Sequence, residues 1–293
     1  DIQKIFHQNK PNRSSDNTKN PTMTSNSWGL RQSTSSSGYY YFREGATGGS
    51  GVSYSTRPAF MANFDGGASA ARSNEYVDGY ASITAGDEMV NAGVIVVCAA
   101  GNHNQKLVQS GHADYNNYYA SSANTDYADA KTNSVYSSMD NTPTYNSINR
   151  AGYPQQLGVD RSTSPYTYKT IAVGNLDDDH TASGLERKTD SSNMGNLIDC
   201  FASGDQTLAA RDDNSFHVKY NRYDAYYTID SQQSVISKDS YFGGTSAACP
   251  VACGIIATKL QYNRNWTYAD VKNWLSSEVE NTTSSYFYSG TEA

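Results

Sequence analysis

Four short apolar runs, each ending at or beside a glycine, stand out from a polar, loop-rich background. They are PTMTSNSWG (21–29), AGVIVVCAAGN (92–102), YKTIAVGNL (168–176) and NLIDCFASG (196–204). The second run is a series of β-branched residues, which is typical of a strand buried in a parallel sheet. We predict a short strand in each run.

A helix is predicted between the first two strands, over residues 75–93. Its apolar residues recur at a loose helical spacing, and Asn91-Ala-Gly93 has the composition of a helix C-cap. The apolar positions are Tyr76, Tyr80, Ile83, Met89 and Val90. Strand, helix and strand in this order indicate a βαβ crossover, so the predicted fold class is α/β with a parallel sheet flanked by helices.

Two more helices are predicted near the C-terminus, over 250–263 and 266–279. The first is apolar along its length. The second has apolar residues on one face, and Thr267 with Asp270 three residues later forms an N-terminal capping pattern. The residues of that face are Trp266, Val271, Trp274, Leu275 and Val279.

Two long stretches, 103–167 and 205–241, are rich in Tyr, Asn, Asp and Ser and show little periodicity. They exceed ordinary loop lengths. We interpret them as insertions, ordered by tyrosine packing or by partners, in a single domain that spans residues 1–293.

The composition excludes some classes of binding partner. The chain has 29 acidic and 22 basic residues, a net charge of -7, and no basic stripe, so nucleic-acid binding is not expected. No apolar run reaches the roughly 18 residues of a membrane-spanning helix. The many hydroxyl and amide side chains favour an extracellular or viral-particle protein. The polar start, DIQKIFHQNK, lacks a signal peptide's apolar core and indicates the interior of a longer polypeptide.

The four cysteines each lie in an apolar or small-residue stretch, and none belongs to a CxxC motif. We interpret them as small buried hydrophobic residues rather than as a disulfide framework. They are Cys98, Cys200, Cys249 and Cys253.

The stretch GGTSAACP (243–250) has two interpretations. Thr245-Ser246 can cap the helix that follows, because Ser and Thr are good caps and Pro250 is tolerated in a first helical turn. Alternatively, Gly243-Gly244 allows a sharp turn that exposes the Ser246 hydroxyl as a nucleophile.

Asn102 follows the predicted buried strand directly, at the carboxyl end where sites form in α/β sheets. One interpretation is a turn-forming Gly-Asn pair. The other is an amide donor aimed at a developing oxyanion, which contributes about 3–4 kcal/mol of transition-state stabilisation.

Five motifs in one order resemble those of the subtilisin-like serine proteases, the subtilase family: TSNSWG, VVCAAGNHNQ, KTIAVGNL, SSNMGNLIDCFASG and GGTSAACPVACGIIA. The family's serine motif GTS-x-A-x-P is matched from Gly244 to Pro250, and its A-A-G-N by Ala99–Asn102. Its S-x-G is matched at residues 27–29. Its S-N-x-G…D…A-P-G is matched from Ser192, with Ser203 in place of the proline.

The resemblance implies roles for these residues. Ser246 would be the nucleophile, and the Asn102 side chain with the Ser246 N–H would form the oxyanion hole. The segment Ser27, Trp28, Gly29 would pair with an extended peptide or protein substrate. Ala99, Ala100 and Gly101 would line the pocket for the residue before the scissile bond.

A serine nucleophile needs an adjacent base, and the sequence offers none in the family's order. In subtilases the Asp and the H-G-T His precede S-x-G, whereas only 26 residues precede Ser27 here and His7 is followed by Gln-Asn. The other histidines all follow Asn102, and His103, which is adjacent to it, is expected near the site. They are His103, His112, His180 and His217.

Three explanations stay open. The chain is the C-terminal part of a serine endopeptidase whose Asp and His lie in an N-terminal segment of the same precursor. Alternatively, it is a catalytically inactive structural or interaction protein, such as part of a viral particle or surface assembly. The third explanation is a base supplied by another chain. The presence of both Ser246 and Asn102 favours the enzyme.

No cofactor is expected from the motifs. Calcium is common in the family, and the oxygen-rich turns 177–179 and 212–213 can ligate it. Neither has the EF-hand spacing, and solvated acidic turns are the simpler interpretation.

Overall fold

The computed structural model describes residues 2–29, 84–116 and 151–177, and also 187–205 and 243–278. It further describes residues 149 and 207 and the backbone of five short strands, which are β2 (Ser37–Phe42), β3 (Val52–Thr56), β5 (Tyr118–Ala120), β8 (Tyr226–Thr228) and β9 (Val235–Ser237).

A four-stranded parallel sheet carries the fold, and each strand lies in one of the four predicted runs. The strands are β1 (Met23–Asn26), β4 (Ile95–Ala99), β6 (Ile171–Leu176) and β7 (Cys200–Ser203), in the order β1-β4-β6-β7. β4 and β6 pair in parallel on both sides, and β4 is completely buried. The predicted α/β class with a parallel sheet is therefore confirmed.

The crossover between β1 and β4 contains a helix over residues 84–91. Its Met89 and Val90 pack with Val96 on one face of the sheet. The helix ends in a Schellman motif, in which the Gly93 N–H bonds the Val90 carbonyl and the Val94 N–H bonds that of Met89. The predicted C-cap is confirmed, whereas the N-terminal part of the prediction, 75–83, lies outside the described residues.

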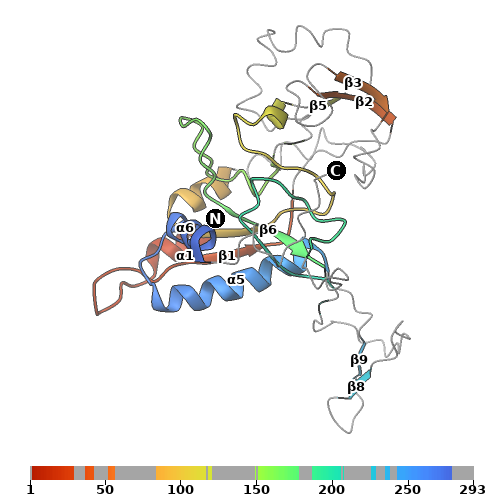
Figure 1. Ribbon diagram of the computed structural model, residues 1–293. Coiled ribbons are helices and arrows are strands. Elements are labelled where there is room, and N and C mark those ends of the chain that lie inside the picture. The colour runs from red at the N-terminus through yellow and green to blue at the C-terminus, as the bar shows by residue number, and fades with distance from the viewer. Residues whose placement is uncertain are drawn as a thin grey trace.

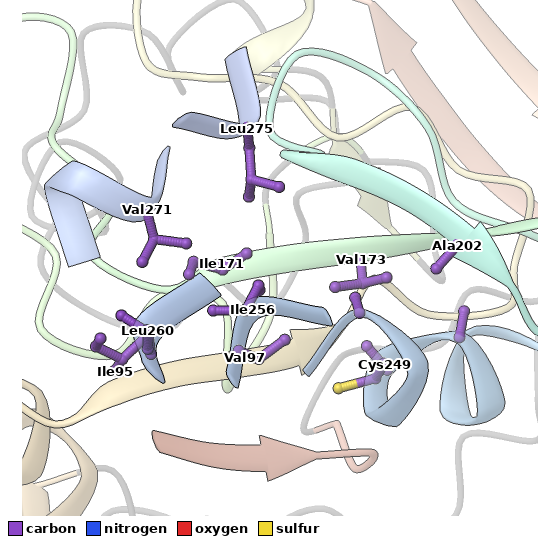
Figure 2. Packing of buried hydrophobic residues seen from close by; sticks show 13 residues of the cluster. Ile95, Val97, Ile171, Val173, Ala202, Cys249, Ile256, Leu260, Val271 and Leu275 are labelled. Carbon is purple, nitrogen blue, oxygen red and sulfur yellow. The ribbon is translucent and has the colours of Figure 1, made fainter. Parts of the chain in front are cut away.

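The opposite face of the sheet is covered by α5 (Thr245–Tyr262), which runs along the strands in Figure 1. Every second residue of the strands points toward the helix and packs against helix residues that are four positions apart. Figure 2 shows this packing around Ile256 and Leu260. The strand side chains include Ile95, Val97, Ile171 and Val173, and the helix contributes Ala248, Ala252, Ile256 and Leu260. Each large aliphatic side chain buried here contributes about 1.5–3 kcal/mol.

α5 begins at Thr245, five residues before the predicted start at Pro250, so that predicted boundary is wrong. A proline inside a helix removes the N–H that would bond the carbonyl four residues earlier, here that of Ser246. The Ser27 hydroxyl donates to this carbonyl instead, at 2.8 Å. A contact from outside the helix therefore compensates for Pro250, which sequence spacing does not reveal.

The last described helix is α6 (Tyr268–Glu278). The Asp270 carboxylate accepts from the Thr267 N–H at 2.7 Å, and the Asp270 N–H reaches the Thr267 hydroxyl at 3.4 Å. The predicted N-cap is confirmed. Val271 and Leu275 of this helix enter the core beside α5 (Figure 2). Lys272 forms a 2.9 Å ion pair with Asp199, whose pKa is raised by burial.

A short N-terminal helix, α1 (Ile2–Asn9), was not predicted. It is held by a Lys4–Glu88 ion pair of 2.7 Å and by a 2.8 Å contact between the His7 Nδ1 and the Thr22 hydroxyl. Its apolar side chains Ile2, Ile5 and Phe6 are exposed. The two remaining sheets, β3-β2-β5 and β8-β9, are antiparallel.

Candidate functional site

A pocket of about 180 Å³ lies where the carboxyl ends of β1 and β4 meet the N-terminus of α5. The structure brings all eight predicted site residues into its lining. They are Ser27, Trp28, Gly29, Ala99, Ala100, Gly101, Asn102 and Ser246. Three chain segments that are far apart in sequence thus converge at one edge of the sheet, as expected for an α/β fold.

Ser246 is half-buried in the first turn of α5. The helix N-cap is Gly244, at φ 75°, and no side chain makes a cap hydrogen bond there. The interpretation of Ser246 as a capping residue is therefore wrong. Gly244 is needed because its backbone is left-handed and because a Cβ there would lie 2.9 Å from the Asn102 Nδ2.

The Asn102 side chain has a fixed orientation. Its Oδ1 accepts from the Thr245 N–H at 2.9 Å and from the Thr245 hydroxyl at 2.8 Å. The same hydroxyl accepts from the Gly101 N–H at 3.1 Å. With its oxygen held by two donors, the exposed amide turns its Nδ2 protons away from Thr245, where they can meet a ligand.

The Ser246 N–H is the second chemically relevant donor. The first N–H groups of a helix have no intrahelical partner. That of Thr245 is taken by Asn102. The next one, on Ser246, lies at the positive end of the α5 dipole, where a negative charge is stabilised.

The segment from Ser27 to Gly29 is exposed and follows β1, which is an edge strand of the described sheet. Trp28 is 43% exposed, and its Nε1 donates to the Asn26 side chain at 3.2 Å. An exposed edge of this kind can pair with an extended peptide by backbone hydrogen bonds.

The pocket also contains residues that the sequence reasoning missed. Gln155 is buried and its Nε2 donates to the Ala99 carbonyl at 2.5 Å, so it fixes the wall that continues β4. The missed lining residues are Leu107, Gly152, Tyr153 and Gln155, whereas His103 was expected near the site and Thr245 belongs to the serine motif. No spacing signal marked 152–155, because these residues lie inside the stretch interpreted as an insertion.

The described histidines have different surroundings. His103 lines the pocket. His7 contacts Thr22, and burial is the main cause of its lowered pKa. The His112 Nδ1 accepts the Asp114 N–H at 3.0 Å. His180 and His217 lie outside the described residues.

The cysteines are free thiols. Burial raises the pKa of Cys200 to about 12 and that of Cys253 to about 11, and it also raises that of Cys98. Thiols with such high pKa values are not nucleophilic at neutral pH. The interpretation as small buried residues holds for Cys98 and Cys249, while Cys200 and Cys253 are half-buried.

Within the described residues, no cluster of three or more His, Cys, Asp or Glu side chains has the arrangement of a metal site. Asp177 pairs with Arg187 at 2.9 Å. The other aspartates proposed for calcium, at 178–179 and 212–213, lie outside the described residues.

The model of the subtilase family, Peptidase S8, matches residues 13–289. The chain belongs to the subtilase family. This subtilase therefore has the fold of a family of serine proteases, as the ordered motifs predicted. No curated protein matches the chain.

Three solved structures resemble this subtilase. A cold-adapted subtilisin-like serine proteinase is 19% identical, with 71% of this chain and 46% of that chain covered and a TM-score of 0.35. The prenylagaramide maturation protease PagA is 15% identical (65% and 42% covered, TM-score 0.31), and a lanthipeptide protease is 17% identical (72% and 53% covered, TM-score 0.33). The subtilase described here spans about half the length of these structures.

In the part of the chain that the structure describes, no helix combines the length and apolarity needed to cross a membrane.

Proposed function

We propose that this subtilase chain is the serine-bearing part of an endopeptidase. Ser246 is the nucleophile, and an N-terminal segment with the Asp and the His completes the site. The observation that carries the proposal is the orientation of Asn102, whose oxygen is held by Thr245 while its Nδ2 protons remain for a ligand beside Ser246.

The reaction follows from these positions. The Ser246 Oγ attacks the peptide carbonyl while the His of the completing segment takes its proton. The carbonyl oxygen becomes an oxyanion that accepts from the Asn102 Nδ2 and the Ser246 N–H. The C–N bond then breaks, the amine leaves with the proton from His, and water hydrolyses the acyl-enzyme.

The substrate class is a peptide or protein in extended conformation. The exposed segment after the edge strand β1 can pair with the backbone of such a substrate, which supports this class. The exposed Trp28 in the same segment also supports it. The pocket walls at Ala99–Gly101 and Gly152 are small and uncharged, which favours a side chain without charge before the scissile bond.

The test is labelling with a fluorophosphonate probe of two forms of the protein, this chain alone and the chain with its N-terminal segment. We expect modification of Ser246 only in the longer form, because the base is supplied there. Ser246→Ala is the control and should remove the label. If no form that includes the N-terminal segment is labelled on Ser246, the proposal fails, and the alternative of a catalytically inactive interaction protein replaces it.

A further inference from the structure

The segment that contains the SSNMG motif, residues 188–195, runs beside the chain that carries Asn102. The Asn104 N–H bonds the Ser191 carbonyl at 2.7 Å, and the Leu107 N–H bonds that of Met194 at 2.7 Å. The Lys188 Nζ donates to the Asn104 side chain at 2.7 Å, and burial lowers the pKa of this lysine. The chain that follows β4 is thus held by a second segment at residues 104 and 107.

Asn193 makes the central contacts of this pairing and is completely buried. Its Nδ2 donates to the Ala100 carbonyl at 2.7 Å. Its Oδ1 accepts from the N–H groups of His103 and Gln105, at 3.1 and 3.0 Å. Its own N–H bonds the Gly101 carbonyl at 2.9 Å.

These four bonds are made to residues on both sides of Asn102 in the chain. Two go to the carbonyls of the residues before it, and two come from N–H groups after it. Asn102 itself is exposed, and within the described residues its side-chain hydrogen bonds come from the other side, from Thr245. One buried amide therefore fixes the backbone on both sides of the residue whose Nδ2 must meet the oxyanion.

Asn193 is in turn anchored to the sheet. The Ser192 hydroxyl donates to the Asn193 carbonyl at 3.0 Å and accepts the N–H of Asn175, in β6, at 2.9 Å. These contacts fix the position of Asn102 relative to β6, a central strand of the sheet.

We propose that Asn193 is a positioning residue for the oxyanion donor: it sets the Asn102 amide against Thr245 and so aligns Nδ2 with the site. The inference rests on the proposed function. An oxyanion hole contributes fully only when its donors are held before the reaction. The Asn193 side chain does not line the pocket, and its hydrogen bonds go to Ala100, His103 and Gln105, so it acts through Asn102.

The variant that tests this is Asn193→Ala, which removes the three side-chain bonds without introducing a charge. Asn193→Asp is the second variant: it keeps the acceptor for His103 and Gln105, replaces the donor to Ala100 with a carboxylate oxygen, and buries a negative charge there. The matched control is Asn196→Ala, since the exposed Asn196 accepts from the Gln109 N–H at 2.9 Å and makes the same kind of bond away from Asn102.

The first readout does not require activity. NMR hydrogen exchange should show the His103 and Gln105 amides losing about tenfold or more of their protection in Asn193→Ala, since a lost buried bond of about 1.4 kcal/mol corresponds to a factor of ten. The Asn102 side-chain NH₂ signal should shift or broaden. Both should be unchanged in Asn196→Ala. An unaltered Asn102 signal in both Asn193 variants overturns the inference.

The second readout is a double-mutant cycle on the longer form with a peptide substrate. We expect Asn193→Ala to lower kcat by about 10²-fold with little change in KM, as for a lost oxyanion donor. In the Asn102→Ala background the same change should have almost no further effect. Equal losses in both backgrounds overturn the inference. If the wild-type protein itself does not react, the proposed function fails, and the Asn102 signal alone decides whether Asn193 positions it.

Discussion

The two walls of the pocket are built in opposite ways. The wall after β4 is braced: Asn102 lies between a buried amide at Asn193 and the Thr245 hydroxyl, and the bonds that hold it are 2.7–3.1 Å long. The wall after β1 is open, with Ser27, Trp28 and Gly29 all exposed. Both walls follow a parallel strand, so the strand ends alone do not explain the difference.

The difference matches two chemical demands. In the proposed mechanism, stabilising an oxyanion requires donors that do not reorganise when charge develops, and hydrogen bonds to backbone groups on both sides of Asn102 would hold its amide in this way. Binding an extended peptide requires unpaired backbone at a sheet edge, and extra bonds there would compete with the substrate. The same sheet thus carries one wall that is held by hydrogen bonds and one that is left exposed, as a peptide-binding edge would need.

The largest effect should come from Asn102→Asp in the braced wall. This change keeps an oxygen for Thr245 but replaces the donor with a negative charge at the proposed oxyanion position. We expect kcat to fall by at least about 10²–10³-fold, the loss seen when a subtilisin loses this kind of donor. The free energy of unfolding should change by less than about 0.5 kcal/mol. A kcat within threefold of wild type would show that the braced wall has no catalytic role.

The next largest effect concerns the support beneath Ser246, the proposed nucleophile. A Cβ at Gly204 would lie 2.5 Å from the Ala248 backbone nitrogen and 2.7 Å from the Gly244 carbonyl. Gly204→Ala should displace the start of α5 and lower the free energy of unfolding by about 1–3 kcal/mol, measured by denaturant titration.

Gly254→Ala is the matched control for that change, because a Cβ at Gly254 meets nothing within 4 Å. It should stabilise α5 by about 0.5–1 kcal/mol, since alanine favours a helix interior over glycine. Equal effects of the two alanines would contradict the close packing of Gly204.

A smaller effect is expected where the open wall is joined to the first turn of α5. Ser27→Ala removes the donor to the Ser246 carbonyl that Pro250 leaves unpaired, which should cost about 1 kcal/mol of unfolding free energy. In a Pro250→Ala background the helix regains its own N–H donor, so the same change should cost almost nothing. Thermal unfolding of the four proteins of this cycle measures the coupling, and strict additivity would rule out the compensation.

The smallest effect should come from Trp28→Ala in the open wall. Trp28 is 43% exposed, so its loss should change the unfolding free energy by less than about 0.5 kcal/mol. We expect KM to rise several-fold with kcat unchanged, which is the pattern when the substrate and the transition state lose the same amount of binding energy. A fall in kcat comparable to that of Asn102→Asp would erase the distinction between the walls.

The strands of the parallel sheet could be predicted from the sequence because each lies in a continuous apolar run. The N-terminus of α6 could be predicted from the Thr267–Asp270 capping pattern. The eight residues that sequence reasoning selected from the ordered motifs line one pocket, and their roles there stay predictions. The same reasoning missed the true start of α5, since the contact that compensates for Pro250 comes from Ser27, 219 residues away in the chain. It also missed the contacts of Asn193, Thr245 and Gln155, which depend on tertiary packing and leave no periodic signal.

The most direct test of the central claim is the mass of the acyl-enzyme. The longer form, mixed with an activated ester, should release a burst of one leaving group per protein molecule, because acylation precedes slower hydrolysis. Peptide mass spectrometry should place the acyl group on Ser246. Ser246→Ala should show neither burst nor adduct, and its unfolding free energy should stay within about 0.5 kcal/mol of wild type. A burst with the adduct on another residue, or no adduct at all, would contradict the account.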